Sequence, residues 1–225
     1  MDEFAKLRDR MVTVQLARRG IRDERVLRAM RTVPRERFVR EGFEEFAYRD
    51  SALPIEERQS ISQPYIVAAM IEAAEIAPGD HVLEVGAGSG YAAAVLGQIA
   101  ERVIAIERHA KLAALAAGRM AALGYDNVEI RVGDGTEGLP LEAPFEAILV
   151  AAGGPAVPQA LRQQLAVGGH LVIPVGDPGH QKLCKISRIG VDRFEDAELG
   201  AVMFVPLIGA QGWRENGSDG SGSTR

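Results

Sequence analysis

Hydrophobic positions along the chain follow two different periods, and the change falls near residue 80. Over the first 48 residues apolar side chains recur every three or four positions, which predicts amphipathic helices. The first such series is Phe4, Leu7, Met11 and Val14. Gly20 then predicts the end of the first helix, and Asp23 predicts the N-terminal cap of a second one. Ser62 before Pro64 predicts the cap of a further helix, which we expect to run to about residue 74.

From residue 81 onward, short apolar runs alternate with helical segments. Strands are predicted at 81–85, 102–106, 128–132, 145–150 and 170–175, and helices at about 91–99, 109–123 and 157–166. This alternation is typical of a parallel sheet covered on both faces. Two further β-like stretches, 182–189 and 199–207, have no helix between them, so we expect them to pair antiparallel at one edge. The predicted fold is α/β: a Rossmann-like, doubly wound, mostly parallel seven-stranded sheet with an antiparallel edge and an N-terminal helical extension.

Length and composition limit the domain organisation. A chain of 225 residues fits one domain, or one domain with a small appendage. We expect a helical, substrate-side extension over 1–78, a ligand-binding core over 79–213, and a polar, Gly/Ser-rich tail or linker over 214–225. Hydrophobic residues make up 47% and charged residues 25%, which excludes wholesale disorder.

The patterns of charge, cysteine and hydropathy argue against several functional classes. The longest uncharged stretch, 85–100, is shorter than the roughly 20 residues needed to span a bilayer, and the N-terminus mixes both charge signs, which disfavours a secretory signal. Cys184 is the only cysteine, so no intramolecular disulfide forms, and we expect a cytoplasmic protein. Residues 1–40 carry twelve basic against six acidic side chains. Without interleaved aromatic residues, this pattern favours a solvated helix face over nucleic-acid binding.

A glycine-rich turn joins the first strand of the core to its helix, at Gly86, Gly88 and Gly90. Such a turn lets a ligand approach the backbone closely. Bulky Tyr91 occupies the third small position of the dinucleotide fingerprint, which disfavours a pyrophosphate. No P-loop lysine motif occurs either, so phosphoryl transfer lacks its anchor.

Three acidic residues accompany this turn at successive strand ends: Glu84 before the loop, Glu107 after the second strand and Asp134 after the third. In a parallel sheet these ends lie together at the strand-order switch point, where ligands bind. A carboxylate at Glu107 can accept both hydroxyls of a ribose, one at Asp134 can bind an adenine amino group, and one at Glu84 can face an ammonium group. The pattern therefore favours a cationic adenosine ligand such as S-adenosylmethionine.

If the ligand is S-adenosylmethionine, residues missing from the sequence exclude several chemical classes of methyl acceptor. Methylation of base amino groups usually needs an Asn/Asp-Pro-Pro-aromatic segment after the fourth strand, where this chain has Ala151-Ala152-Gly153-Gly154-Pro155. Carbon-5 methylation of pyrimidines needs a cysteine nucleophile, and Cys184 lies well beyond that place. The four histidines show no metal-ligand spacing. A pocket without an obvious base suits an acceptor that is already ionised, such as a carboxylate.

Longer motifs resemble the protein-L-isoaspartate O-methyltransferase family. The resemblance rests on Gln59–Tyr65 (QSISQPY) and Val82–Tyr91, and it covers about residues 4–213. Further matching segments are Ala29–Phe38 (AMRTVPRERF), Glu107-Arg108, Gly133-Asp134-Gly135, Gly168–Gly176 (GGHLVIPVG) and Phe204–Leu207 (FVPL).

The resemblance implies a function and a set of site residues. It implies transfer of a methyl group from S-adenosylmethionine to the α-carboxylate of an L-isoaspartyl residue, with S-adenosylhomocysteine as product, followed by succinimide formation and partial return to aspartate. Ser62 is the implied catalytic residue. The implied cofactor residues are Gln59, Ser60, Ile61, Glu84, Gly86, Gly88, Ser89, Glu107, Arg108, Asp134 and Gly135, and the implied substrate residues are Ile61, Ser62, Val205 and Pro206; no metal is implied.

Two departures from the family pattern keep alternatives open. The family usually has glycine just before Gln59, where this chain has Glu56-Glu57-Arg58, and it typically has Thr-Ala-Ala-x-Pro at residues 151–155. The first alternative is a carboxyl methyltransferase for an aspartate in a dedicated peptide, and the second is a cofactor-binding module without turnover. We expect a monomer whose partners are isoaspartyl proteins or peptides, with neither nucleic acid nor membrane as a partner.

Overall fold

The computed structural model describes residues 3–215 and is built around one seven-stranded sheet, in the order β5-β4-β3-β6-β7-β8-β9. The pairs among β3 to β7 are parallel, whereas β7–β8 and β8–β9 are antiparallel. The fold class predicted above is confirmed. The strands are β3 (His81–Val85), β4 (Arg102–Glu107), β5 (Val128–Val132), β6 (Phe145–Val150), β7 (Leu165–Asp177), β8 (His180–Gly190) and β9 (Arg193–Val202).

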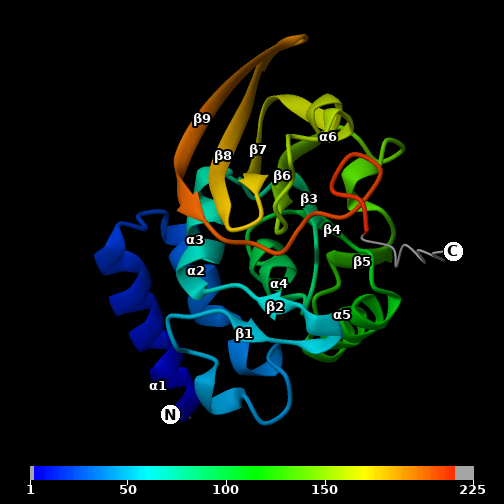
Figure 1. Ribbon diagram of the computed structural model, residues 1–225. Helices are drawn as coiled ribbons and strands as arrows, with labels where there is room; N and C mark the ends of the chain where they lie inside the picture. The colour runs from blue at the N-terminus through cyan, green and yellow to red at the C-terminus, as the bar shows by residue number, and fades with distance from the viewer. Residues whose placement is uncertain (1–2, 216–225) are drawn as a thin grey trace, which may run out of the picture.

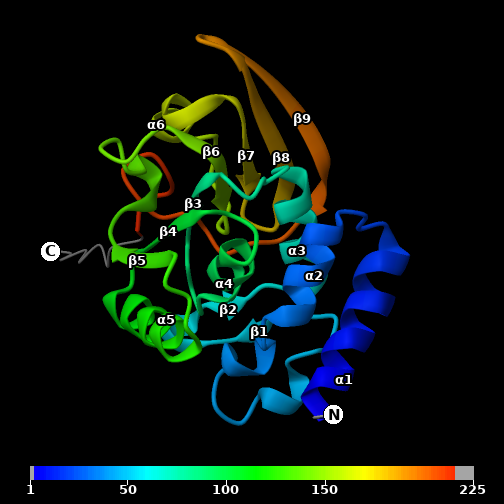
Figure 2. The ribbon, with the colours of Figure 1, turned by 180° about the vertical axis from the view of Figure 1, so that it is seen from behind.

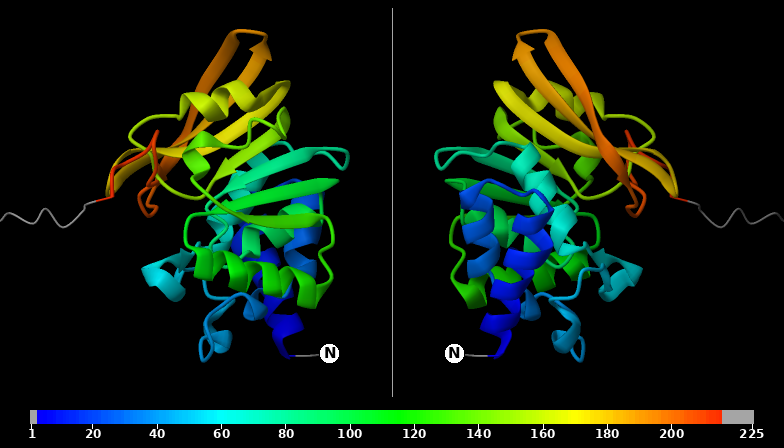
Figure 3. Two further views of the ribbon diagram at one scale, coloured as in Figure 1. Left: turned by 90° about the vertical axis from the view of Figure 1, so that its right-hand side faces the viewer. Right: turned by 90° about the vertical axis from the view of Figure 1, so that its left-hand side faces the viewer.

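Helices cover both faces of this sheet (Figures 1 and 2). Alternate residues of the central strands divide between two hydrophobic clusters, because successive side chains of a strand point to opposite faces. Val82, Val103 and Leu149 belong to the larger cluster, which includes residues of α2 to α5, and Leu83 and Ile148 belong to the smaller one with Leu161 of α6. Figure 3 shows α5 and α6 on opposite sides of the sheet. These helices are α2 (Glu24–Thr32), α3 (Pro64–Ala73), α4 (Tyr91–Gly97), α5 (Ala110–Leu123) and α6 (Gln159–Gln164).

The antiparallel edge differs in part from its prediction. Strand β9 begins at Arg193 rather than near residue 199, and the segment 204–207 lies outside it. Residues Arg193–Glu198 are mostly polar and exposed, so no hydrophobic pattern marked them as a strand. Val205 and Leu207 instead bond to Gly153 after β6, through Gly153 N–H to Val205 O at 2.8 Å and Leu207 N–H to Gly153 O at 2.8 Å. This crossing brings the C-terminal segment back over the carboxyl ends of the central strands.

The first helix contains a change of helical type that the sequence pattern did not reveal. α1 (Glu3–Arg10) continues into a π-helical segment, Met11–Leu16, and a 3₁₀ turn, Ala17–Arg19, ended by left-handed Gly20. The wider π turn rotates the buried face. As a result Val12 and Leu16 are fully buried, whereas Val14, expected on the apolar face, is 40% exposed.

Of the caps predicted for the next two helices, one is confirmed and one is wrong. Asp23 caps α2 as expected, because its carboxylate accepts the N–H of Arg25. The predicted cap at Ser62 is wrong: Gln63 holds the N-cap position of α3, without a side-chain cap, and Pro64 begins the helix. Ser62 lies one residue earlier, where its carbonyl accepts a hydrogen bond from Arg35 Nη2 at 2.8 Å.

Between α2 and α3 the chain forms 3₁₀ turns at Arg35–Arg37, Glu44–Phe46 and Glu56–Arg58, and a short antiparallel ribbon of β1 (Leu53–Pro54) and β2 (Ser60–Ile61). A further 3₁₀ turn, Gly135–Glu137, follows β5. Within residues 3–215, no helix has the length and apolar character that crossing a membrane requires. The predicted flexible tail falls mostly on 216–225, outside the described residues.

Candidate active site

The site is built where β3, β4 and β6 end, and both oxygens of its carboxylate Glu107 are hydrogen-bonded. Glu107 closes β4, and β3 pairs with both β4 and β6 in parallel register, so the three strand ends lie together. Glu107 Oε2 accepts the N–H of Gly88 at 2.9 Å, and Oε1 accepts the N–H of His109 at 2.9 Å. Because a carboxylate oxygen can accept more than one hydrogen bond, both oxygens keep capacity for ligand hydroxyls.

The glycine loop follows β3 in a conformation that favours glycine. Gly86, Gly88 and Gly90 have φ values of 91°, 53° and 87°. The N–H groups of Gly86 and Ala87 both donate to Ile106 O, at 2.8 and 3.1 Å, which holds the loop against the end of β4. This geometry leaves the loop backbone bare of side chains on its cavity side.

A cavity lies over this loop and collects many of the residues singled out from the sequence. Its walls include the predicted cofactor residues Gln59, Ser60, Gly86, Gly88, Glu107, Arg108 and Gly135, together with Val205 and Pro206. We call it the cofactor cavity. It brings together segments from the N-terminal part, the sheet and the C-terminal crossing.

Glu84 and Ser89, also predicted for this site, lie beneath it in the protein interior. Glu84 is 1% exposed, and its Oε2 makes no hydrogen bond within the described residues. Burial, reinforced by the nearby Glu107 carboxylate, raises the pKa of Glu84 well above its usual range. Ser89 is buried as well, and its carbonyl accepts a hydrogen bond from Arg119 at 3.0 Å.

Asp134 is held in place by protein groups. Its Oδ1 accepts the N–H and the hydroxyl of Thr136 at 2.9 and 2.7 Å, and its Oδ2 accepts the N–H of Ala210 at 2.7 Å. Burial acts to raise the pKa of Asp134, but these hydrogen bonds outweigh it and the pKa is lowered. A side chain at Gly209 would meet Asp134 Oδ1 at 2.1 Å, so glycine is needed there. Asp134 thus ties the C-terminal loop to the site while its neighbour Gly135 lines the cavity.

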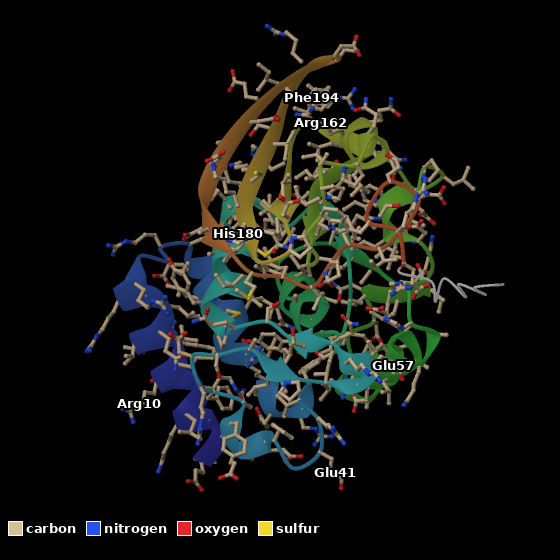
Figure 4. All side chains as sticks on the ribbon, in the orientation of Figure 1. Arg10, Glu41, Glu57, Arg162, His180 and Phe194 are labelled. Carbon is tan, nitrogen blue, oxygen red and sulfur yellow. The ribbon has the colours of Figure 1, made fainter. Side chains whose placement is uncertain are left out.

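A segment before β2 arches over the glycine loop. A side chain built at Gly88 would lie 3.6 Å from Ile55 Cδ1, which places Ile55 directly above the loop. The segment is also joined to α5 by an ion pair between Glu57 and Lys111 at 3.2 Å. Figure 4 shows Glu57 at this end of the molecule, beside α5.

A second cavity adjoins the first and contains Ser62. We call it the acceptor cavity; Ser60, Ala151 and Val205 line both cavities and so form their junction. Ile61 is buried next to Ser62, with 4% of its surface exposed. The two cavities thus allow two ligands to meet at one point.

Arg35 is a supporting residue that the sequence patterns did not single out. Its guanidinium is fully buried, donates to Ala47 O at 2.7 Å and Ser62 O at 2.8 Å, and lies 4.6 Å from the ring centre of Tyr91. Burial lowers the pKa of Arg35, while Tyr91 partly offsets this effect. Arg35 therefore connects the Ser62 segment to the first residue of α4. The only sequence signal was its place after Val33-Pro34 in the matched segment.

His109 is a second residue that the sequence patterns passed over. It lines the cofactor cavity, and its Nε2 is buried without a hydrogen-bond partner among the described residues. Its position directly after Glu107-Arg108 was the available signal.

The residues present fit a cationic adenosine ligand. The cavity offers a carboxylate with spare acceptor capacity at Glu107, bare backbone at the glycine loop and an unpartnered ring nitrogen at His109. Buried polar groups without partners are rare in folded proteins, so such groups commonly find theirs in a ligand or in water.

Comparisons with known proteins agree with this geometry. The family model described as Protein-L-isoaspartate(D-aspartate) O-methyltransferase matches residues 7–212. A protein-L-isoaspartate O-methyltransferase 1 of Rhodopseudomonas palustris (strain HaA2) is 57% identical over 211 residues, which cover 93% of this chain and 86% of the relative. A protein-L-isoaspartate O-methyltransferase of Brucella anthropi is 52% identical, covering 95% of this chain and 98% of its own.

Two solved structures are similar over most of the fold. A protein-L-isoaspartate O-methyltransferase superposes with a TM-score of 0.82 at 27% identity, covering 91% of this chain and 67% of its own. A Plasmodium falciparum protein described as a protein-L-isoaspartate O-methyltransferase, in complex with S-adenosyl-L-homocysteine, gives a TM-score of 0.77 at 26% identity, covering 89% and 98%.

Proposed function

The chain belongs to the protein-L-isoaspartate(D-aspartate) O-methyltransferase family, and we propose how its own residues carry out that reaction. The reaction is S-adenosylmethionine-dependent methylation of the α-carboxylate of L-isoaspartyl residues in damaged proteins or peptides. The observation that carries our assignment of roles is the junction at Ser60, Ala151 and Val205, where the cofactor cavity meets the cavity that contains Ser62.

We assign the cofactor to the cavity over the glycine loop. S-adenosylmethionine supplies an electrophilic methyl group on a sulfonium sulfur. Glu107 accepts the ribose hydroxyls, the Gly86–Gly88 backbone supports the ligand, and Gln59 and Ser60 border its methionine end. Glu84 keeps its proton in the ligand-free protein, and in this proposal the ammonium group of the bound cofactor lowers the pKa of Glu84 and ionises it. Gly135 lies on the adenine side, where Asp134 acts by holding the surrounding loop.

We assign the acceptor to the second cavity. A carboxylate is ionised at neutral pH, so no base has to remove a proton before it attacks the methyl carbon. The new carbon–oxygen bond forms as the sulfur–carbon bond breaks, and S-adenosylhomocysteine leaves. The Ser62 hydroxyl donates a hydrogen bond to one acceptor oxygen and aims the other. Val205 at the junction borders the substrate chain, Pro206 lies beside it on the cofactor side, and buried Ile61 supports Ser62. The methyl ester then closes to a succinimide with loss of methanol, and hydrolysis returns part of it to aspartate.

We propose a cytoplasmic monomer, because the single Cys184 has no cysteine partner in the sequence and the two cavities are formed within one chain. Residues 1–78, which supply Gln59 to Ser62, form the substrate side of the site in this proposal.

Methyl transfer from labelled S-adenosylmethionine to an isoaspartyl peptide and to its aspartyl twin tests the function. The isoaspartyl α-carboxylate sits at a different distance from the peptide backbone than an aspartyl side-chain carboxylate. Misplacement by about 1 Å can cost about a hundredfold in rate, so we expect at least that preference. An inert isoaspartyl peptide beside a methylated aspartyl peptide would support the dedicated-peptide alternative, and no transfer to either would support a binding module without turnover.

Ser62→Ala tests the catalytic role, with Ser51→Ala as a matched control on the exposed surface outside both cavities. Loss of one hydrogen bond to a charged group costs about 1.5–3 kcal/mol, or about tenfold to a hundredfold in kcat/KM. We expect that loss for Ser62→Ala, with calorimetric affinity for S-adenosylhomocysteine unchanged, and no loss for Ser51→Ala. Equal rates for both variants would remove Ser62 from the reaction.

A further inference from the structure

A third cavity continues the acceptor cavity along the surface. It lies between α3, the turn after Ala17–Arg19 and the end of β9, and its volume of about 330 Å³ is in the range of small-ligand pockets. Ile66, Ala201 and Val202 line both this cavity and the acceptor cavity. We call the third cavity the side groove. Figures 1 and 2 both show the end of β9 beside α3.

The chemistry of the side groove is apolar. Ile66, Ala69 and Ala73 of α3 face Leu183 and Leu199 of the sheet across it. Its two charged residues are already engaged by protein groups. Arg19 pairs with Asp50 at 2.7 Å and lies 3.9 Å from the ring centre of Tyr65, and Glu72 accepts the N–H groups of Arg22 and Asp23 at 2.6 and 2.7 Å.

A β-bulge turns one side chain toward this groove. In the β8–β9 pairing Leu183 lies opposite Gly200 and Cys184 lies opposite Glu198, so Leu199 is the extra residue. Gly200 has a φ of 140°, which favours glycine. Bulges commonly re-aim a side chain, and here the bulged Leu199 lines the groove while remaining 46% exposed.

The strand β9, which forms one wall of the groove, is also the edge of the sheet. β9 is the last strand of the sheet order, so its outer edge pairs with no other strand among the described residues. An extended polypeptide can add to such an edge through main-chain hydrogen bonds while its side chains fill adjacent pockets. From Val202 to Leu199 the distance along the strand is about 10 Å, which is about three extended residues.

We propose that the side groove binds the part of the substrate polypeptide that flanks the isoaspartyl residue, and that it selects apolar side chains about three to five positions away. This inference rests on the proposed function, since it takes the isoaspartyl carboxylate to sit beside Ser62. Continuity with the acceptor cavity identifies the occupant as the same substrate chain.

Synthetic substrates of three kinds test the proposal. A five-residue isoaspartyl peptide is compared with the same peptide extended by five residues that are either leucine- and valine-rich or glycine- and serine-rich, on the N-terminal or the C-terminal side. We expect one apolar extension to lower KM about tenfold relative to the polar extension, with kcat unchanged. Equal KM values for apolar and polar extensions on both sides would overturn the proposal.

Variants on both walls locate the effect. Leu199→Glu and Ala69→Lys place a charge in the groove from β9 and from α3, and Val191→Glu, at a residue that is 71% exposed between β8 and β9, is the matched control. We expect the first two to abolish the advantage of the apolar extension without changing KM for the five-residue peptide, and the control to retain it. Retention of the advantage in both groove variants would also overturn the proposal.

The same measurements distinguish failure of the proposed function from failure of the side-groove proposal. If the five-residue isoaspartyl peptide is inert with the wild-type enzyme, the proposed function fails. If it is methylated and the extensions make no difference, only the side groove is refuted.

Discussion

Glu84 and Glu107 are neighbouring buried carboxyl groups that differ in their hydrogen bonds. Both oxygens of Glu107 accept backbone N–H groups, whereas Glu84 Oε2 has no partner among the described residues and lies almost fully buried. The pKa of Glu84 is raised well above its ordinary value near 4.5 by burial and then by the Glu107 charge. A buried carboxyl group with a strongly raised pKa beside a cavity is typical of functional sites.

The raised pKa of Glu84 predicts a pH-dependent stability. Above pH 4.5 the unfolded chain releases this proton while the folded chain retains it, so the folded state binds more protons and its stability falls as pH rises. Glu84→Gln removes this dependence because glutamine resembles the protonated carboxyl. We expect the melting temperature of the ligand-free variant to match the wild type near pH 4 and to exceed it increasingly as the pH rises above 5.

Thermal unfolding of wild type and variant across that pH range is the measurement, with Glu195→Gln on the exposed strand β9 as control. The control should leave the wild-type profile unchanged. A constant offset between Glu84→Gln and wild type at every pH would contradict a retained proton at Glu84.

At the scale of elements, the segment over the glycine loop carries backbone strain. Glu57 and Arg58 have φ values of 52° and 57°. This left-handed region is unfavourable for residues other than glycine. Arg58 is exposed, and it makes no ion pair within residues 3–215. The resemblance described above leads us to expect glycine just before Gln59, and a left-handed Arg58 is consistent with that expectation.

Arg58→Gly is predicted to raise stability slightly. Relief of the left-handed conformation gains about 1–2 kcal/mol, and the greater freedom of glycine in the unfolded chain takes back about 0.5–1 kcal/mol. We expect a net gain of about 0.5–1 kcal/mol by chemical denaturation. Arg28→Gly in the right-handed helix α2 is the matched control and should lose about 1 kcal/mol. Similar losses in both variants would contradict the strain at Arg58.

The boundaries of an element could be predicted where residues close in sequence determine them. The strands β3, β5 and β6 begin and end at the predicted residues, because β3 and β6 are mostly apolar and β5 alternates apolar with charged residues, and all three are short. The π turn at Met11–Leu16 and the cap of α3 could not be predicted. The π turn leaves no trace in the spacing of three and four residues, and α3 begins after Gln63, which makes no side-chain cap.

The residues of the site could likewise be predicted only where strand ends bring them together. Glu107, Gly86 and Gly88 follow strands whose ends must meet, so their proximity follows from the alternation of strands and helices. By contrast, Ile55 above Gly88 and the bulge at Leu199 depend on long-range contacts that no sequence period records. Asp134 shows an intermediate case: its place beside the site was predicted, but its hydrogen bonds to Thr136 and Ala210 were not.

At the scale of the whole molecule, the cofactor cavity joins distant parts of the chain. Its walls come from Gln59 and Ser60, from the ends of β3 and β4, and from the C-terminal segment 205–208. A ligand bound there contacts all three parts at once. Because these contacts exist only in the folded state, binding should stabilise the whole fold rather than one loop.

S-adenosylhomocysteine is therefore predicted to raise the melting temperature of the entire domain in one transition. At a concentration of about 100 times Kd the gain is about 2.7 kcal/mol, which for a domain of this size corresponds to about 5–10 °C. Glu107→Ala should lose most of this shift, since it removes the carboxylate from the ribose side of the cavity. Glu101→Ala, at the residue directly before β4, is the matched control and should keep the full shift.

Calorimetric scans with and without ligand provide the measurement. A full shift in Glu107→Ala would exclude Glu107 from ligand binding, and two separate transitions, only one of them moved by ligand, would show that the cavity does not couple the N-terminal, central and C-terminal parts.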